Sequence, residues 1–231
     1  MWAKKSLEKG DKGGFKNVLK DNNVQKVKNH YLHLLNPRHP RSIPKKLIWL
    51  ITIPQHKKVI VLGIDPGTAT TGYGVVRDNP DGRLIKVCYG VIRTEADTPY
   101  PIRLKEIHEG ITFLINEYKP EAIVTEQLFF NKNVATALSV GQARGVVILT
   151  AALAGIELAE YTPIQVKEAV VGYGRAEKMQ VQQMVKVVLG LEEIPKPDDA
   201  ADALAVAICH LNSYKMRSFL LLRDNQSSKK N

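Results

Sequence analysis

Four acidic residues stand where this sequence predicts the ends of strands or the start of a helix. Asp65 and Glu126 each follow a short run of β-branched and aliphatic residues, a pattern typical of a buried strand. Asp199 and Asp202 are spaced so that both carboxylates lie on one face of a predicted helix. Carboxylates gathered this way repel one another unless a cation lies between them, and hard divalent cations prefer oxygen ligands. The pattern therefore predicts a metal-dependent site of the kind that cleaves phosphodiester bonds.

Each acid also has a structural explanation when it is taken alone. Asp65 precedes a Pro-Gly pair, and Asp is a favoured turn residue. Glu126 is harder to explain, because a charged group that closes an apolar strand must be solvated, paired or metal-bound. Asp198 is expected to cap the last helix and to leave Asp199 and Asp202 pointing inward, although the spacing leaves the choice between Asp198 and Asp199 as metal ligand open. The four positions together favour a shared metal site.

A cluster of four acids suits two Mg²⁺ ions roughly 3.5–4 Å apart, one activating water and the other stabilising the leaving oxygen. Mg²⁺ keeps several water ligands and needs few carboxylates per ion. We expect Asp65 to bridge the two ions, because the first strand of a mixed sheet is usually central. The predicted cofactor is thus a pair of Mg²⁺ ions, for which Mn²⁺ is expected to substitute.

The elements that must position these acids follow the order βββαβαβα. A strong turn signal at 78–82 predicts that the first three strands form an antiparallel meander. The predicted strands cover 58–65, 72–76, 84–93, 122–126 and 157–161, and the predicted helices cover 101–118, 133–154, 163–171, 177–190 and 198–214. This order predicts an α/β domain with a five-stranded mixed sheet flanked by helices.

The positive charge of the chain is concentrated in its first quarter. Residues 1–58 hold 14 Lys and Arg against 3 Asp and Glu, whereas the remainder holds 19 against 20. We interpret 1–58 as a basic, poorly ordered N-terminal extension, 59–214 as the nuclease domain and 215–231 as a polar C-terminal tail. The extension is either a DNA-binding arm or a tail that is present through a mis-assigned start codon. The second interpretation is favoured, because Val59 directly precedes a strand and a GTG codon can start translation.

Composition also narrows the cellular setting. The two cysteines lie far apart, and the N-terminus does not resemble a signal peptide. The apolar run at 47–53 is far too short to span a bilayer. These features predict a cytoplasmic protein that has no membrane partner.

Six segments of the chain closely resemble RuvC-type Holliday junction resolvases, over residues 59–212 and with the expected spacing. The resemblance does not extend to 1–58. The segments are Gly63-Ile64-Asp65-Pro66-Gly67 with Thr71-Gly72-Tyr73-Gly74, Glu126-Gln127-Leu128-Phe129, Gly141-Gln142-Ala143-Arg144-Gly145, Gln165-Val166-Lys167, Ala176-Glu177-Lys178 and Asp199-Ala200-Ala201-Asp202-Ala203-Leu204.

The resemblance implies a ribonuclease H-like fold and a homodimer that holds a four-way DNA junction. Each protomer would nick one of two opposed strands during recombination and repair and leave a 5′-phosphate. RuvA and RuvB, which drive branch migration, would be partners. The residues that match the family pattern are the catalytic acids Asp65, Glu126, Asp199 and Asp202, the base-stacking Phe129, and the DNA-facing Lys167 and Lys178.

Other interpretations of the sequence remain. A YqgF-like nuclease of the same fold would act on another nucleic acid, although the segments at 141–145 and 199–202 favour the resolvase. Actin-like ATPases share the first motif but need two domains, for which this chain is too short. A DNA-binding protein without catalytic activity is the third interpretation. The small-residue helix at 139–153 fits either a dimer surface or a packed core.

Overall fold

A computed structural model describes the backbone of residues 58–127 and 134–227 and the side chains of 58–127 and 137–214. Its elements are β1 (Ile60–Asp65), β2 (Thr70–Asp78), β3 (Leu84–Arg93), α3 (Tyr100–Tyr118), β4 (Ala122–Glu126), α4 (Val134–Ala154), β5 (Glu157–Tyr161), α5 (Pro163–Val171), α6 (Lys178–Leu189) and α7 (Asp198–Ser227). The five strands form one sheet in the order β3-β2-β1-β4-β5. β1, β2 and β3 pair antiparallel, whereas β4 lies parallel to both β1 and β5.

This topology confirms the predicted mixed sheet, the antiparallel meander and the central position of β1. The end of the last helix was predicted wrongly. α7 continues to Ser227 rather than stopping at residue 214, so most of the segment expected to be a tail is helical. The physical reason is that residues 215–227 contain neither Gly nor Pro, and a helix without such a stop signal continues. The predicted extension lies outside the described residues except for its last residue, Lys58.

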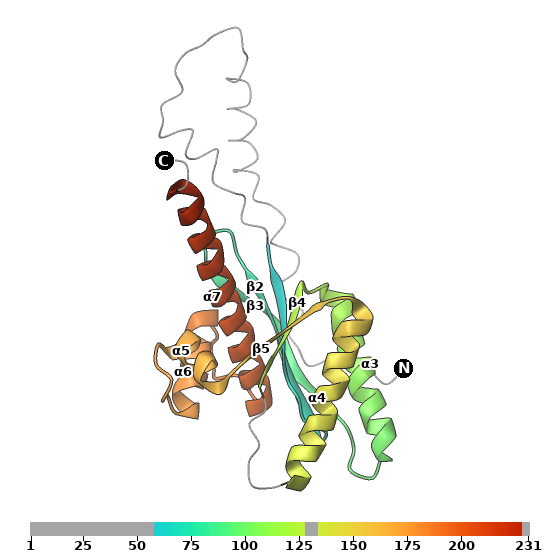
Figure 1. Cartoon of the computed structure of the whole chain (residues 1–231). Coiled ribbons are helices and arrows are strands. Elements are labelled where there is room, and N and C mark those ends of the chain that lie inside the picture. The colour runs from blue at the N-terminus through green and yellow to red at the C-terminus, as the bar shows by residue number, and fades with distance from the viewer. Residues whose placement is uncertain (1–57, 128–133, 228–231) are drawn as a thin grey trace, which may run out of the picture. The chain divides into compact units, whose positions relative to one another are not determined.

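The sheet separates two layers of helices (Figure 1). α5, α6 and α7 cover one face, and α3 and α4 cover the other. The core on the α7 side combines strand residues with the apolar face of α7, including Val61, Val124, Leu204 and Ile208. Because parallel strands β1 and β4 end at the same edge of the sheet, Asp65 and Glu126 are both carried to that edge.

α7 lies directly against the backbone of the two central strands. A Cβ atom at Gly72 would stand 2.0 Å from the backbone oxygen of Asp199, and one at Gly63 would stand 2.0 Å from that of Ala203. Both distances are far inside van der Waals contact, so only glycine fits at these positions while α7 keeps its place. Gly72 is also the registered β2 partner of Asp65. The missing side chain therefore brings the start of α7 close to the end of β1 that carries Asp65.

α4 combines a buried side with an exposed apolar side. Ala143, Val147 and Ala151 are buried, and Arg144 forms an ion pair with Glu160 of β5 that fixes the helix to the sheet. Large apolar side chains remain exposed elsewhere on the helix, namely Leu138, Ile148, Leu149 and Leu153. Within the described residues, Ala137–Ala154 is also the one segment that is long and apolar enough to cross a membrane by composition. Its contacts with the sheet make it part of the folded domain.

Candidate active site

The four acids come from three elements that meet at one edge of the sheet. Asp65 is the last residue of β1, and Glu126 is the last residue of β4. Alternation along β1 puts Asp65 on the same face as Gly63, and that face is covered by α7. Asp199 and Asp202 lie in the first turns of α7. The structure thus brings together the four acids that the sequence singled out.

Asp65 carries the clearest electrostatic sign of this convergence. The pKa of its carboxyl group is raised to about 7, chiefly by burial and then by the charges of Asp202, Asp199 and Glu126, in that order, while Lys178 opposes the rise. A pKa this far above the usual range means that the folded protein resists a negative charge at this position. A bound cation would remove that resistance.

Glu126 and Asp202 show the same effect more weakly. Burial is the largest cause of the raised pKa of each, and the charge of Asp202 adds to the rise at Glu126. The charge of Asp199 adds to the rise at Asp202. Each carboxylate therefore responds to at least one other member of the set, as expected for groups that face a common space.

Lys178, the first residue of α6, supplies the positive charge nearest to the acids. Its Nζ lies 3.0 Å from Oδ2 of Asp202 and 3.2 Å from Oδ2 of Asp198. Burial tends to lower the pKa of Lys178, but hydrogen bonds and ion pairs with Asp202 and Asp198 outweigh burial and raise it. The lysine thus offsets the repulsion among the carboxylates.

Asp198 does not have the capping position expected from the sequence. The backbone carbonyl of Pro197 accepts the first helical hydrogen bonds, from Ala200 and Ala201, so Asp198 is the first residue inside α7. Its exposed carboxylate turns to Lys178, and this pairing lowers its pKa. The charge of Asp199, in contrast, raises the pKa of Asp65. The charges of both aspartates raise the pKa of Asp202, but only Asp199 is among the causes of the raised pKa of Asp65, which favours Asp199 as the member of the cluster.

The structure places two of the three predicted DNA-contacting residues. Lys167 lies on α5, and its charge lowers the pKa of Glu126, as does that of Lys178. Both lysines are therefore close to the acids. Phe129 lies outside the described residues.

The donor set fits a hard divalent cation, although it is not closed around one. Within the described residues, no group of three or more His, Cys, Asp and Glu side chains is arranged closely enough to hold a metal ion. Like charges without a cation stand apart, and Lys178 takes up one oxygen of Asp202. Burial is the largest cause of the raised pKa of three of these carboxyl groups, and repulsion from other acids adds to it, so a bound cation would stabilise their charged forms. Carboxylate oxygens are the ligands that Mg²⁺ and Mn²⁺ prefer.

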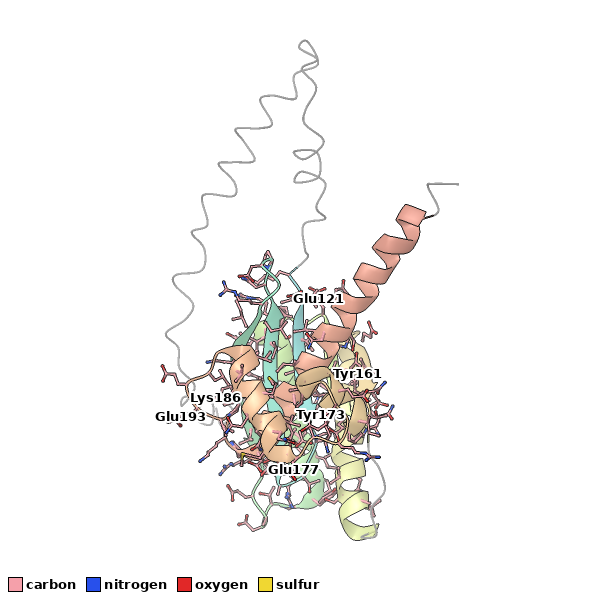
Figure 2. The ribbon with its side chains drawn as sticks, turned by 90° about the vertical axis from the view of Figure 1, so that its left-hand side faces the viewer. Glu121, Tyr161, Tyr173, Glu177, Lys186 and Glu193 are labelled. Atoms are coloured by element: carbon pink, nitrogen blue, oxygen red, sulfur yellow. The ribbon has the colours of Figure 1, made fainter. Side chains whose placement is uncertain are left out.

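Tyr161 and His210 form a contact beside Glu126 that the sequence pattern did not reveal. Tyr161 is the registered β5 neighbour of Glu126, so both side chains point to the same face of the sheet. The Tyr161 hydroxyl lies 3.0 Å from Nδ1 of His210 on α7, and the two rings meet edge to face. Figure 2 shows Tyr161 on the side of the sheet that carries α5 and α6. The pair joins the outer strand to α7 next to the site.

Comparison with known proteins identifies the arrangement. Residues 61–210 match the family described as crossover junction endodeoxyribonuclease RuvC. A relative of that name from Syntrophomonas wolfei is 59% identical over 160 residues, which cover 69% of this chain and 92% of the relative. One from Desulforamulus reducens is 57% identical over 152 residues, which cover 66% of this chain and 93% of the relative.

Solved structures agree with the sequence matches. The structure of Thermus thermophilus RuvC is 37% identical, with a TM-score of 0.65, over 68% of this chain and 96% of that one. The complex of T. thermophilus RuvC with a Holliday junction substrate is 34% identical, with a TM-score of 0.63 and the same coverage. The predicted ribonuclease H-like fold is thereby confirmed.

Proposed function

Because the chain belongs to the RuvC family of crossover junction endodeoxyribonucleases, we propose that Asp65, Glu126, Asp199 and Asp202 are its catalytic metal ligands. The chain is a metal-dependent nuclease that resolves Holliday junctions. The observation that supports the residue assignment is that the charges of the other three carboxylates all raise the pKa of Asp65. The YqgF-like alternative loses its support, because the relatives compared above carry the RuvC name and the two solved structures compared above are RuvC.

The proposed metal is a pair of Mg²⁺ ions, which Mn²⁺ replaces. When bound, the ions supply an activated water and positive charge for the leaving oxygen of the phosphodiester. Asp65 in the centre of the sheet, Glu126 at the end of β4 and the two α7 acids would hold the ions. Lys178, which is paired with Asp202, would together with Lys167 offset negative charge on the reacting phosphate. Phe129 is proposed to stack on an unpaired base near the crossover.

A homodimer is the proposed acting form, because two symmetric nicks need two sites. The exposed apolar side chains of α4 are the surface we assign to the partner protomer: Leu138, Ile148, Leu149 and Leu153. Apolar side chains gathered on one exposed helix are typical of a protein–protein interface. Each protomer would then nick one of two opposed strands and leave a 5′-phosphate. RuvA and RuvB are proposed to deliver the junction.

Cleavage of a synthetic four-way junction tests this assignment. Wild-type protein and the Asp65→Asn variant are incubated with junction and with linear duplex, in Mg²⁺ and in chelator, and nicked strands are resolved by electrophoresis. We expect Mg²⁺-dependent paired nicks in the junction alone, lost in Asp65→Asn while junction binding persists. Unchanged nicking by Asp65→Asn would refute the assignment of the metal site.

A further inference from the structure

The loop at residues 172–177 joins the two helices that carry the lysines of the site. Lys167 lies about one turn before the end of α5, and Lys178 is the first residue of α6. The charges of both lysines act to lower the pKa of Glu126. The loop therefore stands beside the acids, on the sheet face that α7 covers.

Several contacts fix the shape of this loop. Gly172 ends α5 with φ 96°, a left-handed conformation suited to glycine. A Cβ at Gly174 would lie 2.7 Å from Cγ2 of Ile164, so the loop packs tightly on α5. The Tyr173 hydroxyl donates to Oε1 of Gln180 at 2.8 Å, and that oxygen also accepts from the backbone N–H of Glu177 at 2.8 Å. The loop is preorganised rather than free.

Two side chains on the loop, Tyr173 and Arg175, are exposed. Tyr173 is 45% exposed although its hydroxyl is fixed, and Figure 2 shows it near Glu177 on the side facing the viewer. Arg175 is exposed and, within residues 58–127 and 137–214, takes part in no ion pair. Arg83 and Arg144, in contrast, are paired with Asp81 and Glu160. An anchored aromatic ring beside an available guanidinium is a combination suited to a nucleic-acid backbone.

We propose that Tyr173 and Arg175 bind the sugar–phosphate backbone of one junction arm next to the cleavage site, an inference that rests on the proposed function. The guanidinium of Arg175 binds a phosphate through two N–H groups, and the ring of Tyr173 packs on the adjacent deoxyribose. Because the loop is already ordered, little conformational entropy is lost when DNA binds. The contact positions the arm and leaves the chemical step to the acids.

The salt dependence of junction binding separates the two contacts. The dissociation constant of a four-way junction is measured without divalent cations over a range of KCl concentrations. Arg175→Ala is expected to reduce the slope of log K against log salt by about 1, because one phosphate contact is lost. Tyr173→Ala is expected to raise Kd roughly fivefold with the slope unchanged, because the ring carries no charge. Tyr173→Phe keeps the ring and is expected to stay within about twofold of wild type.

Arg83→Ala is the matched control, because Arg83 is an exposed arginine in the β2–β3 turn, at the end of β1 opposite to Asp65. It is expected to leave both Kd and slope unchanged, and thermal melting of every variant verifies folding. A wild-type slope for Arg175→Ala together with a wild-type Kd for Tyr173→Ala would overturn the proposal and leave the loop as a surface for a protein partner. If wild-type protein showed no preference for junction over duplex, the proposed function itself would fail.

Discussion

Two adjacent aspartates at the start of α7 have different surroundings. Asp199 contributes to the raised pKa of Asp65, whereas Asp198 points to Lys178 and the solvent. The carbonyl of Pro197 accepts the first helical hydrogen bonds, so both aspartates lie inside the first turn of α7 rather than at the capping position. The proposed metal site therefore includes Asp199 rather than its neighbour Asp198.

Exchanging each aspartate tests that difference. Asp199→Asn is expected to reduce the cleavage rate by about a thousandfold or more, because a neutral amide is a poor ligand for Mg²⁺. Asp198→Asn is expected to cost less than about tenfold, because it removes one exposed partner of Lys178. Single-turnover cleavage of saturated junction measures both rates. Equal losses in the two variants would show that the α7 ligand is misassigned.

The pKa of Asp65 predicts how stability depends on pH. Its pKa is about 7 in the folded chain and near 3.8 when unfolded, so between these values the folded state retains a proton that the unfolded state has released. Stability therefore falls as pH rises through this window and stays reduced above it. Without divalent cations, Asp65→Asn is expected to be more stable than wild type at pH 8, by at most about 4 kcal/mol, and to gain little at pH 4.

Urea unfolding in chelator at both pH values measures this gain. Asp81→Asn is the control, because the pKa of Asp81 is shifted in the opposite direction. Hydrogen bonds from Arg83 lower this pKa to about 2. Its carboxylate contributes stability above the unfolded pKa and loses it as pH falls, so Asp81→Asn is expected to lose a little at pH 8. If Asp65→Asn were less stable than wild type at pH 8, the conclusion that burial and neighbouring carboxylates disfavour the charge of Asp65 would be contradicted.

At the scale of elements, α7 carries two of the proposed ligands and lies close to β1 and β2. Glycine at positions 63 and 72 leaves room for its backbone. The same helix contributes Leu204 and Ile208 to the core, so its placement is fixed by burial as well as by close approach. The packing of α7 in the core therefore also positions the two acids at its start.

Gly72→Ala tests the close approach. The new Cβ would meet the backbone oxygen of Asp199, so α7 must shift away from β1. We expect a loss of about 2–4 kcal/mol in unfolding free energy, with cleavage reduced even under conditions where the variant is folded. Gly82→Asn is the control, because Gly82 has φ 85° with open space around its Cβ and lies in the β2–β3 turn. Full activity in folded Gly72→Ala would show that the helix tolerates displacement.

Most elements could be predicted from local patterns, whereas the contacts between them could not. Short β-branched runs and the turn at 78–82 predicted the strands and placed Asp65 in the centre. The direction of Asp198 depends on where α6 puts Lys178, and the contact of Gly72 with Asp199 depends on how α7 crosses the sheet. Neither is encoded in spacing along the chain. The end of α7 was missed because a helix that lacks Gly and Pro carries no local stop signal.

At the scale of the whole molecule, α4 links the fold to assembly. One side of it packs on the sheet while Leu149 and Leu153 remain 57% and 70% exposed. The helix is anchored to β5 by the ion pair of Arg144 with Glu160, and its exposed leucines form the surface that we propose for a second protomer. Two sites in one dimer would allow opposed strands to be cut together.

Leu149→Asp is expected to produce a monomer, because a carboxylate buried in an apolar interface is left unpaired. Sedimentation at micromolar concentration measures the mass, and a supercoiled cruciform substrate measures paired against single nicks. The monomer should lose paired nicks. Val187→Asp, 70% exposed on α6, is the control and should remain dimeric. A Leu149→Asp dimer with normal paired cleavage would place the interface elsewhere.

Anomalous diffraction from crystals soaked in Mn²⁺ tests the central claim most directly, because it locates the metal without relying on activity. The expected result is two peaks roughly 3.5–4 Å apart, enclosed by Asp65, Glu126, Asp199 and Asp202 and lost in Asp65→Asn. Crystals at saturating Mn²⁺ with no peak among these carboxylates would contradict the account.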